Sequence, residues 1–342
     1  MKISRSNAFI YTVVALAVIA SVVIVMRSAM TRGKRASLGK AFEYDLDELR
    51  KTDPSLIKYE ESGKIKAGFT EVSAIAVDSE DRIYIAGDRS IRIFNSNGNT
   101  LSKMELSDAP QCLTVTDDGT VYVGMRDHVE VYDPSGVRKA RWESAGEKAV
   151  LTSIAVSGND VFVANAGGRV VLRYDGSGEL VGRIGERDQE RNIPGIVIVG
   201  PYFDLAVADD GLLRVGNAGS QRMEAYTFDG DLELSWGKAS NLIDGFAGCH
   251  NPVNFAFLPD GRLVTCEIGL PRVKIYSASG DFESVVAGAE LFPKSEEPLI
   301  LEGKSDFRNR GLDVAVDSQE RILVLDPSER AVRIFILKEA KS

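Results

Sequence analysis

The sequence has few of the residues and motifs that usually reveal a chemical activity. Its 342 residues contain three cysteines, Cys112, Cys249 and Cys266, and two histidines, His128 and His250. An odd number of cysteines without a C-x-x-C pair argues against a disulfide framework and leaves the cellular compartment undetermined. The sequence has no P-loop, no G-x-S-x-G, no H-E-x-x-H and no haem motif, which excludes the enzymes that these motifs identify.

Positive charge is scarce outside the first forty positions. Residues 1–40 contain seven Lys and Arg and no acid, whereas the whole chain carries a net charge of −9, so residues 41–342 carry −16. Binding to nucleic-acid phosphates needs clustered Lys and Arg. The acidic body therefore argues against nucleic acid as a partner.

The sequence has one long apolar run, from Ala8 to Met26, which is 19 residues without a charge. As a helix it would span about 28 Å at about 1.5 Å per residue, close to the hydrocarbon thickness of about 30 Å. A cleaved signal peptide usually has a shorter apolar region that ends in a small-x-small site, whereas Arg27 follows here. We predict a transmembrane helix over residues 8–26, after a tail of residues 1–7 and before a stalk of residues 27–52.

Two arguments about the orientation of this helix oppose each other. Lys2 and Arg5 precede the helix and five basic residues follow it, which by the positive-inside rule would keep the body in the cytoplasm. Large domains can translocate despite such charges. We expect a single-pass membrane protein whose body is extracytoplasmic.

The rest of the chain repeats one unit six times. Each unit has a short apolar first strand, a tight turn, a second strand, and a third strand that closes on an aromatic residue. The first strands begin 38 to 59 residues apart, at residues 73–77, 111–115, 152–156, 203–207, 253–257 and 312–316. This spacing fits the four strands of a propeller blade. We predict an all-β, six-bladed β-propeller of four-stranded antiparallel blades over residues 53–342, in which residues 56–59 supply the last blade's fourth strand.

The repeats resemble the NHL family over residues 55–337. The similarity rests on the small-apolar first strand, the Asp-Gly turn, and an Arg at the start of the third strand, which is present as Arg169, Arg222 and Arg272. The most typical copy is residues 251–277, NPVNFAFLPDGRLVTCEIGLPRVKIYS. The resemblance implies the propeller fold. It implies less about function, because NHL propellers include scaffolds, protein-binding modules, lyases and metal-dependent hydrolases.

A candidate site follows from counting residues across the tight turns. The count predicts three cross-strand polar pairs, Asp204 with Asn217, Asn254 with Glu267 and Asp313 with Asp326, and also places Ser153 opposite Asn165. These pairs lie in blades 3–6, and long links enter blades 4–6 at the same edge of the ring. We call this edge, where first strands begin and second strands end, the upper rim, and long loops there favour binding. The predicted binding residues are Asn165, Asp204, Asn217, Arg222, His250, Asn254, Glu267, Arg272, Asp313 and Asp326.

Four of these residues also suggest a metal site. Carboxylate and amide oxygens are the ligands that Ca²⁺ prefers, so Asp204, Asn217, Asn254 and Glu267 could hold Ca²⁺ or another divalent cation. The alternative is structural, because acids and amides at strand ends commonly cap the following loop.

The run from Gly248 to Pro252 contains Cys249 beside His250 and leaves several interpretations open. Both side chains could join Cys266 and Glu267 around zinc, Cys249 could act as a thiolate nucleophile, or the two cysteines could form a disulfide. Against the first two, adjacent residues on an extended strand point to opposite sides. A turn ordered by Pro252, with His250 in a hydrogen bond, is the favoured interpretation.

Together these features predict a membrane-anchored, non-catalytic binding or scaffold module. Its partners would be the membrane, through residues 8–26, and a protein or small-molecule ligand at the upper rim of blades 3–6. The alternative is a metal-dependent hydrolase or lyase with a divalent cation at the same rim.

Overall fold

The computed structural model describes residues 46–292 and 311–339. The predicted transmembrane helix of residues 8–26, the tail before it and the stalk up to residue 45 lie outside these residues. Within the described residues, no helix is both long enough and apolar enough to cross a membrane. The membrane segment and the orientation therefore stay predictions.

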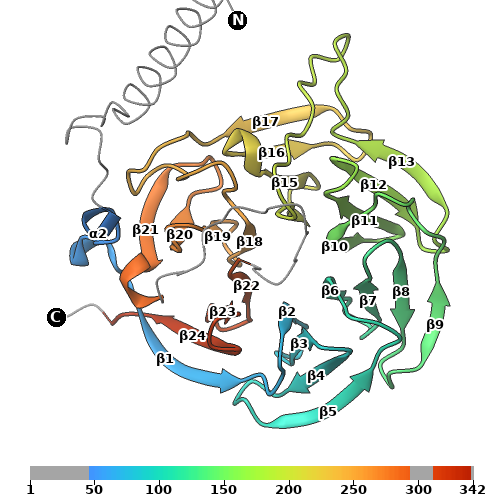
Figure 1. Cartoon of the computed structure of the whole chain (residues 1–342), viewed down its shortest axis with the longest axis horizontal. Coiled ribbons are helices and arrows are strands. Elements are labelled where there is room, and N and C mark those ends of the chain that lie inside the picture. Colours follow the sequence, from blue (N-terminus) through green and yellow to red (C-terminus); the bar gives the residue numbers. More distant parts are fainter. Residues whose placement is uncertain (1–45, 293–310, 340–342) are drawn as a thin grey trace, which may run out of the picture. The chain divides into compact units, whose positions relative to one another are not determined.

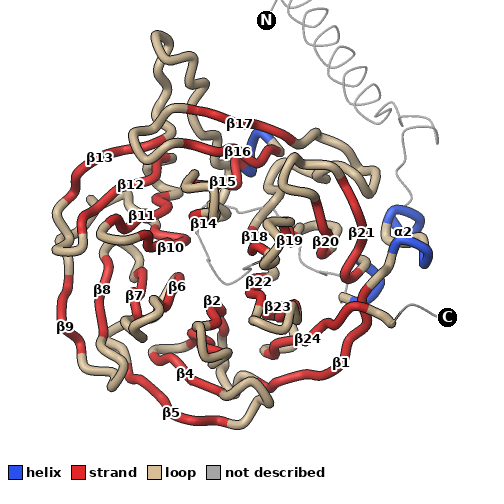
Figure 2. Tube along the Cα trace, turned by 180° about the vertical axis from the view of Figure 1, so that it is seen from behind, coloured by secondary structure: helices blue, strands red, loops and turns tan. Residues whose placement is uncertain are grey.

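Six four-stranded antiparallel sheets form a ring (Figures 1 and 2), which confirms the predicted propeller. Blade 1 contains β2 (Val72–Val77), β3 (Ile83–Gly87), β4 (Ser90–Phe94) and β5 (Thr100–Glu105). Blade 2 contains β6 (Cys112–Val115), β7 (Val121–Gly124), β8 (Val129–Tyr132) and β9 (Arg138–Arg141). Blade 3 contains β10 (Leu151–Ser157), β11 (Asp160–Asn165), β12 (Val170–Asp175) and β13 (Leu180–Ile184). Blade 4 contains β14 (Leu205–Val207), β15 (Leu213–Asn217), β16 (Arg222–Tyr226) and β17 (Leu232–Trp236). Blade 5 contains β18 (Asn254–Phe257), β19 (Leu263–Cys266), β20 (Val273–Tyr276) and β21 (Phe282–Ala287). Blade 6 contains β22 (Asp313–Val316), β23 (Ile322–Asp326), β24 (Ala331–Leu337) and β1 (Tyr59–Lys66). The short helices are α2 (Leu46–Leu49), η2 (Pro54–Leu56), η3 (Ala218–Ser220) and η4 (Ala289–Leu291).

The ring closes as expected, with a strand from the N-terminal side of the propeller completing blade 6. β1 pairs antiparallel with β24, with Tyr59 opposite Leu337 (Figure 1). The predicted bounds, residues 56–59, are wrong: only Tyr59 belongs to the strand, because Asp53 caps a short 3₁₀ turn at Pro54–Leu56 and the strand runs from Tyr59 to Lys66. The pairing covers the edge of β24, which would otherwise be open to other strands.

The cores lie between blades, where aromatic side chains of one blade pack onto the next. Trp142 and Trp236, at the outer strands of blades 2 and 4, fit against Gly178 and Gly280 of the following blades. A Cβ added at either glycine would lie 2.4 Å from the indole. Both glycines also have positive φ, +90° and +94°, so these turns require glycine for two reasons.

The predicted cross-strand pairs are wrong by one residue. The observed partners are Asn254 with Cys266, Asp313 with Leu325 and Ser153 with Ala164, while Gly216 rather than Asn217 donates its N–H to the carbonyl of Asp204. Because successive side chains point to opposite faces of a strand, each predicted pair is split between the two faces of its sheet.

In blades 4–6 the error comes from the turns. In blade 5 the N–H of Leu258 donates to the carbonyl of Arg262 at 2.8 Å, which leaves three residues in the loop. Gly261 ends this loop with a φ of +84°. That is a type I turn followed by a left-handed residue, whereas the predicted register assumed a two-residue turn at Asp260-Gly261.

Candidate functional site

The first strands of all six blades surround a central cavity of about 380 Å³. Among the predicted binding residues, Asp204, Asn254 and Asp313 line it. These strands are the inner edges of their sheets, so the N–H and C=O groups that point away from the sheet, toward the cavity, have no partner strand. The side chains that meet these groups decide how the cavity is built.

Asp204 and Asp313 make the same pair of bonds in two different blades. One oxygen of Asp204 accepts from the N–H of Leu205 at 2.9 Å, and the other accepts from Phe255 of the next blade at 2.7 Å. Asp313 accepts from Val314 at 2.9 Å and from Ile75, across the ring closure, at 3.0 Å. Each carboxylate therefore fastens its blade to the next one.

Ser153 and Asn254 also bond the next blade, but they donate to its backbone carbonyl groups. The Ser153 hydroxyl donates to Leu205 of blade 4 at 3.2 Å, and the Asn254 amide donates to Leu312 at the start of blade 6 at 2.8 Å. The polar side chains of the first strands thus form a set of inter-blade bonds around the cavity.

Asp204 differs from an ordinary aspartate in its protonation. Burial and, to a smaller extent, the negative charge of Asp313 raise its pKa to about 7, although hydrogen bonds from Ser153, Phe255 and Leu205 oppose the shift. A carboxyl group that titrates near neutrality beside a cavity can donate or accept a proton in a reaction.

The predicted residues at the ends of the second strands occupy another place. Asn165, Asn217, Glu267 and Asp326 are all buried, and none of them lines the central cavity. In blades 3, 4 and 5 the side chain accepts from the backbone of the link that enters the same blade, at Val150, Val197 and Ala247. Asp326 instead accepts from Ser328 and Arg333. The alternative from sequence, a cap on the following loop, describes Asn165, which also accepts from Gly168, and Asp326, whereas Asn217 and Glu267 cap the entering links instead.

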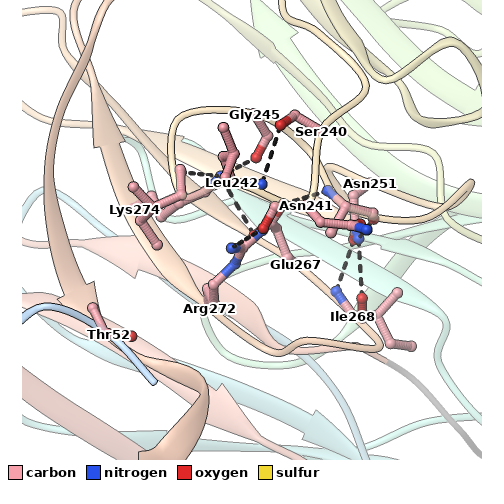
Figure 3. Close-up of polar contacts among 12 residues, drawn as sticks. Thr52, Ser240, Asn241, Leu242, Gly245, Asn251, Glu267, Ile268, Arg272 and Lys274 are labelled. Carbon is pink, nitrogen blue, oxygen red and sulfur yellow. Dashed lines mark hydrogen bonds and ion pairs between the residues drawn. The ribbon is translucent and has the colours of Figure 1, made fainter. Parts of the chain in front are cut away.

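Blade 5 contains a buried charge cluster of Glu267, Arg272 and Lys274 (Figure 3), of which Lys274 was not predicted from the sequence. Glu267 bonds Arg272 Nε at 2.5 Å, and Lys274 Nζ lies 3.4 Å from the same carboxylate. Lys274 is fully buried and donates to Ile243, Gly245 and the Tyr276 hydroxyl. Burial lowers the pKa of its ammonium group to about 8. The cluster holds the link of residues 238–246, because Arg272 and Lys274 both donate to its carbonyls.

The two predicted arginines of the third strands have unlike surroundings. Arg272 is 2% exposed within the cluster, whereas Arg222 is exposed at the start of β16. In blade 4 the position beside Asn217 is taken by the buried Glu224, which accepts from the Asn217 amide at 2.9 Å. The shared sequence pattern therefore does not produce a shared set of contacts.

Cys249 and His250 contact each other, contrary to the expectation that they point apart. Cys249 Sγ lies 3.2 Å from His250 Nδ1, because residues 248–250 form a bend rather than an extended strand. The ring of Tyr202 packs edge-on against the imidazole at 5.7 Å, and burial lowers the pKa of His250. Cys266 is buried in the core and Cys249 is exposed, and the disulfide between them that was considered from sequence is not formed.

The four predicted Ca²⁺ ligands divide between two places. Asp204 and Asn254 lie on the cavity, whereas Asn217 and Glu267 cap the links. Across residues 46–292 and 311–339, no group of three or more His, Cys, Asp or Glu side chains is placed to hold a metal ion. This holds also for the zinc arrangement considered around Cys249.

Comparisons with known proteins show the fold. No protein-family model and no curated protein matches the sequence. Among solved structures, virginiamycin B lyase from Staphylococcus aureus is 15% identical over 83% of this chain and 89% of that chain, with a TM-score of 0.51. A streptogramin B lyase is 11% identical over 82% and 98%, with a TM-score of 0.55, and a chain of a mitotic checkpoint complex is 11% identical over 84% and 95%, also at 0.55. The chain is thus a six-bladed propeller with lyases among its structural neighbours.

Proposed function

We propose that this chain is a membrane-anchored, NHL-type propeller that binds a partner protein through the upper rim of blades 3–6 without catalysing a reaction. One observation carries the proposal: the links into blades 4 and 5 expose apolar side chains from a fixed backbone. Val197, Val199 and Leu242 are 44%, 53% and 69% exposed. Exposed apolar groups on a loop of defined shape favour protein binding.

The first of these links is held by buried contacts on both sides of Val197. Its N–H donates to Asn217 at 3.0 Å, and its carbonyl accepts from Gly219 at 2.9 Å. The neighbouring Ile196 and Ile198 are buried in the core between blades 3 and 4. A backbone fixed in this way loses little conformational entropy when a partner binds.

The second link is held by the blade 5 cluster. Lys274 and Arg272 donate to carbonyls on both sides of Leu242, at Asn241, Ile243 and Gly245 (Figure 3). The N–H of Leu242 donates to Ser240 Oγ at 3.1 Å. The buried charges therefore serve to set the shape of an exposed loop.

Introducing a charge at the exposed apolar residues tests the proposal. We expect Val199→Asp and Leu242→Asp to release proteins that the wild-type chain retains after cross-linking and membrane solubilisation, because a carboxylate would have to be desolvated at the interface. Val137→Asp is the matched control, since Val137 is 55% exposed in the turn between β8 and β9 of blade 2. If the rim variants retain every protein that the control retains, the rim is not the binding surface.

A second function, a hydrolase or lyase, is favoured by Asp204. Its carboxyl titrates at about 7 beside the cavity, and the structural neighbours include lyases, one of them solved with quinupristin. The test is ring opening of quinupristin and simple lactones by the purified chain, with and without added Mg²⁺ or Ca²⁺. The hydrolase or lyase proposal requires turnover that Asp204→Asn abolishes, and turnover unchanged by that substitution would contradict it.

A further inference from the structure

Cys249 and His250 form a pair that is separate from the proposed partner contacts at Val197, Val199 and Leu242. Cys249 is exposed, while Cys112 and Cys266 are both buried. Its sulfur lies 3.2 Å from His250 Nδ1, within reach of an S–H donor and an imidazole acceptor. A thiol needs such a base, or ionisation, to become a nucleophile.

The backbone on both sides of the pair is fixed. Gln221, from the loop after β15, donates to the carbonyl of Gly248. Asn251 is 1% exposed; its amide donates to the carbonyl of Ile268 at 3.0 Å, and its oxygen accepts the N–H of Ile268 at 2.7 Å. The bend that brings sulfur and imidazole together is therefore held by contacts to two other loops, and does not depend on a ligand.

The surroundings of His250 define how the pair would react. The edge-on ring of Tyr202 limits the rotation of the imidazole, and burial lowers its pKa, which keeps it neutral near pH 7. In the tautomer that leaves Nδ1 unprotonated, Nδ1 accepts a hydrogen bond from the thiol S–H in the resting pair and takes the proton when the sulfur attacks.

We propose that Cys249 and His250 form a base-assisted thiol site at which a low-molecular-weight disulfide modifies Cys249 reversibly. Cys249 Sγ attacks one sulfur of the disulfide, the S–S bond breaks, and a mixed disulfide forms. His250 Nδ1 takes the thiol proton and passes it to the departing thiolate, which leaves as a free thiol. Cys249 is thereby oxidised, and half of the small disulfide is reduced.

The other cysteines make this a modification site and not an internal redox relay. Cys266 lies in the core between blades 5 and 6, and burial raises the pKa of its thiol well above the usual value. Cys112 is buried in the core between blades 2 and 3. Neither can displace the adduct, so an external thiol is needed to restore Cys249.

The experiment follows the reaction of the folded full-length chain with dithiodipyridine across pH, with release of thiopyridone as the signal and peptide mapping to locate the adduct. We expect one fast-reacting thiol per chain, located at Cys249 and absent in Cys249→Ser. His250→Gln should slow the reaction about tenfold at pH about 6.5, where few unassisted thiols of pKa about 8.5 are ionised. The two rates should converge at pH about 9.5. His128→Gln is the matched control and should follow wild type throughout.

A second arm replaces the probe with oxidised glutathione at pH about 6.5 and detects the mixed disulfide by intact mass before and after added dithiothreitol. Unfolded wild-type and His250→Gln chains should react alike with dithiodipyridine, which shows that the effect requires the folded bend. The proposal is overturned if folded His250→Gln reacts as fast as wild type at pH about 6.5. It is also overturned if folded Cys249 forms no adduct with either disulfide. Neither outcome bears on partner binding at Val199 and Leu242.

Discussion

Lys274 offers a direct measurement of the buried charges in blade 5. Its side chain has 0% exposure, and burial lowers the pKa of its ammonium group from 10.5 to about 8, with Glu267 opposing the shift. Between these two values the unfolded chain holds a proton that the folded chain has lost. The free energy of unfolding therefore rises with pH between about 8 and 10.

The size of the effect follows from the same two values. A folded pKa of about 8 and an unfolded pKa near 10.5 give a gain of about 2 kcal/mol between pH about 8 and 10. Cys266 and Tyr276 have raised pKa values and act in the opposite direction as pH rises. Burial is the largest cause of both shifts, and a Lys274 variant keeps that burial, so most of their contribution cancels in the difference.

Urea unfolding at pH about 8, 9 and 10 measures this difference. We expect the wild-type chain to gain about 2 kcal/mol of stability relative to Lys274→Met over this range. Methionine is chosen because it removes the ammonium group and keeps an unbranched apolar side chain. Lys238→Met is the control, because Lys238 is 58% exposed and pairs with Asp244 on the surface. If wild type and Lys274→Met show parallel pH profiles, the Lys274 ammonium is not the group whose burial lowers stability at neutral pH.

Two further predictions concern the cavity and the turns. Because the folded pKa of Asp204 is raised to about 7, the folded state holds a proton that the unfolded state has lost, so stability falls as pH rises from about 4 to 7. Asp204→Asn should remove up to about 2 kcal/mol of that fall between pH about 5 and 7, measured by urea unfolding, and an unchanged profile would contradict the raised pKa. Gly178→Ala should destabilise the chain by about 1–3 kcal/mol more than Gly211→Ala in thermal unfolding. Both glycines have positive φ, but only Gly178 lies against Trp142, so equal losses would show that the indole yields to the added methyl.

The propeller could be predicted because its evidence is local and repeated. Each blade has its own apolar first strand, tight turn and aromatic third-strand end, and the repetition confirms each assignment through the others. The sequence also predicted that a strand from the N-terminal side of the propeller completes the last blade. The structure supplies it as Tyr59–Lys66.

The candidate site was predicted less well, and turn geometry is one reason. One extra residue in the loop at Pro259-Asp260-Gly261 moves Glu267 to the opposite face from Asn254. Asn254 then bonds a neighbouring blade and Glu267 caps a link. Hairpin loops of two and three residues have similar Asp-Gly signatures, so the sequence did not decide between them.

The buried Lys274 was missed for another reason. In the segment Val273–Tyr276 it alternates with apolar residues, which in a sheet with one solvated face indicates an exposed side chain. In a propeller both faces of a sheet are covered by neighbouring blades, so an alternating lysine can lie in the interior. Its position between Phe246 and Tyr276, with Nζ 4.9 Å and 5.1 Å from the ring centroids, depends on a link far along the chain.

The sequence by itself therefore determined the number of blades and their strand order, because these follow from short-range patterns repeated along the chain. Only the tertiary structure decided which polar side chains meet. Asp204 reaches Phe255 of the next blade, and Cys249 meets His250 because other loops hold their bend. Such contacts depend on turn length and on the packing of distant segments, which residue order alone does not specify.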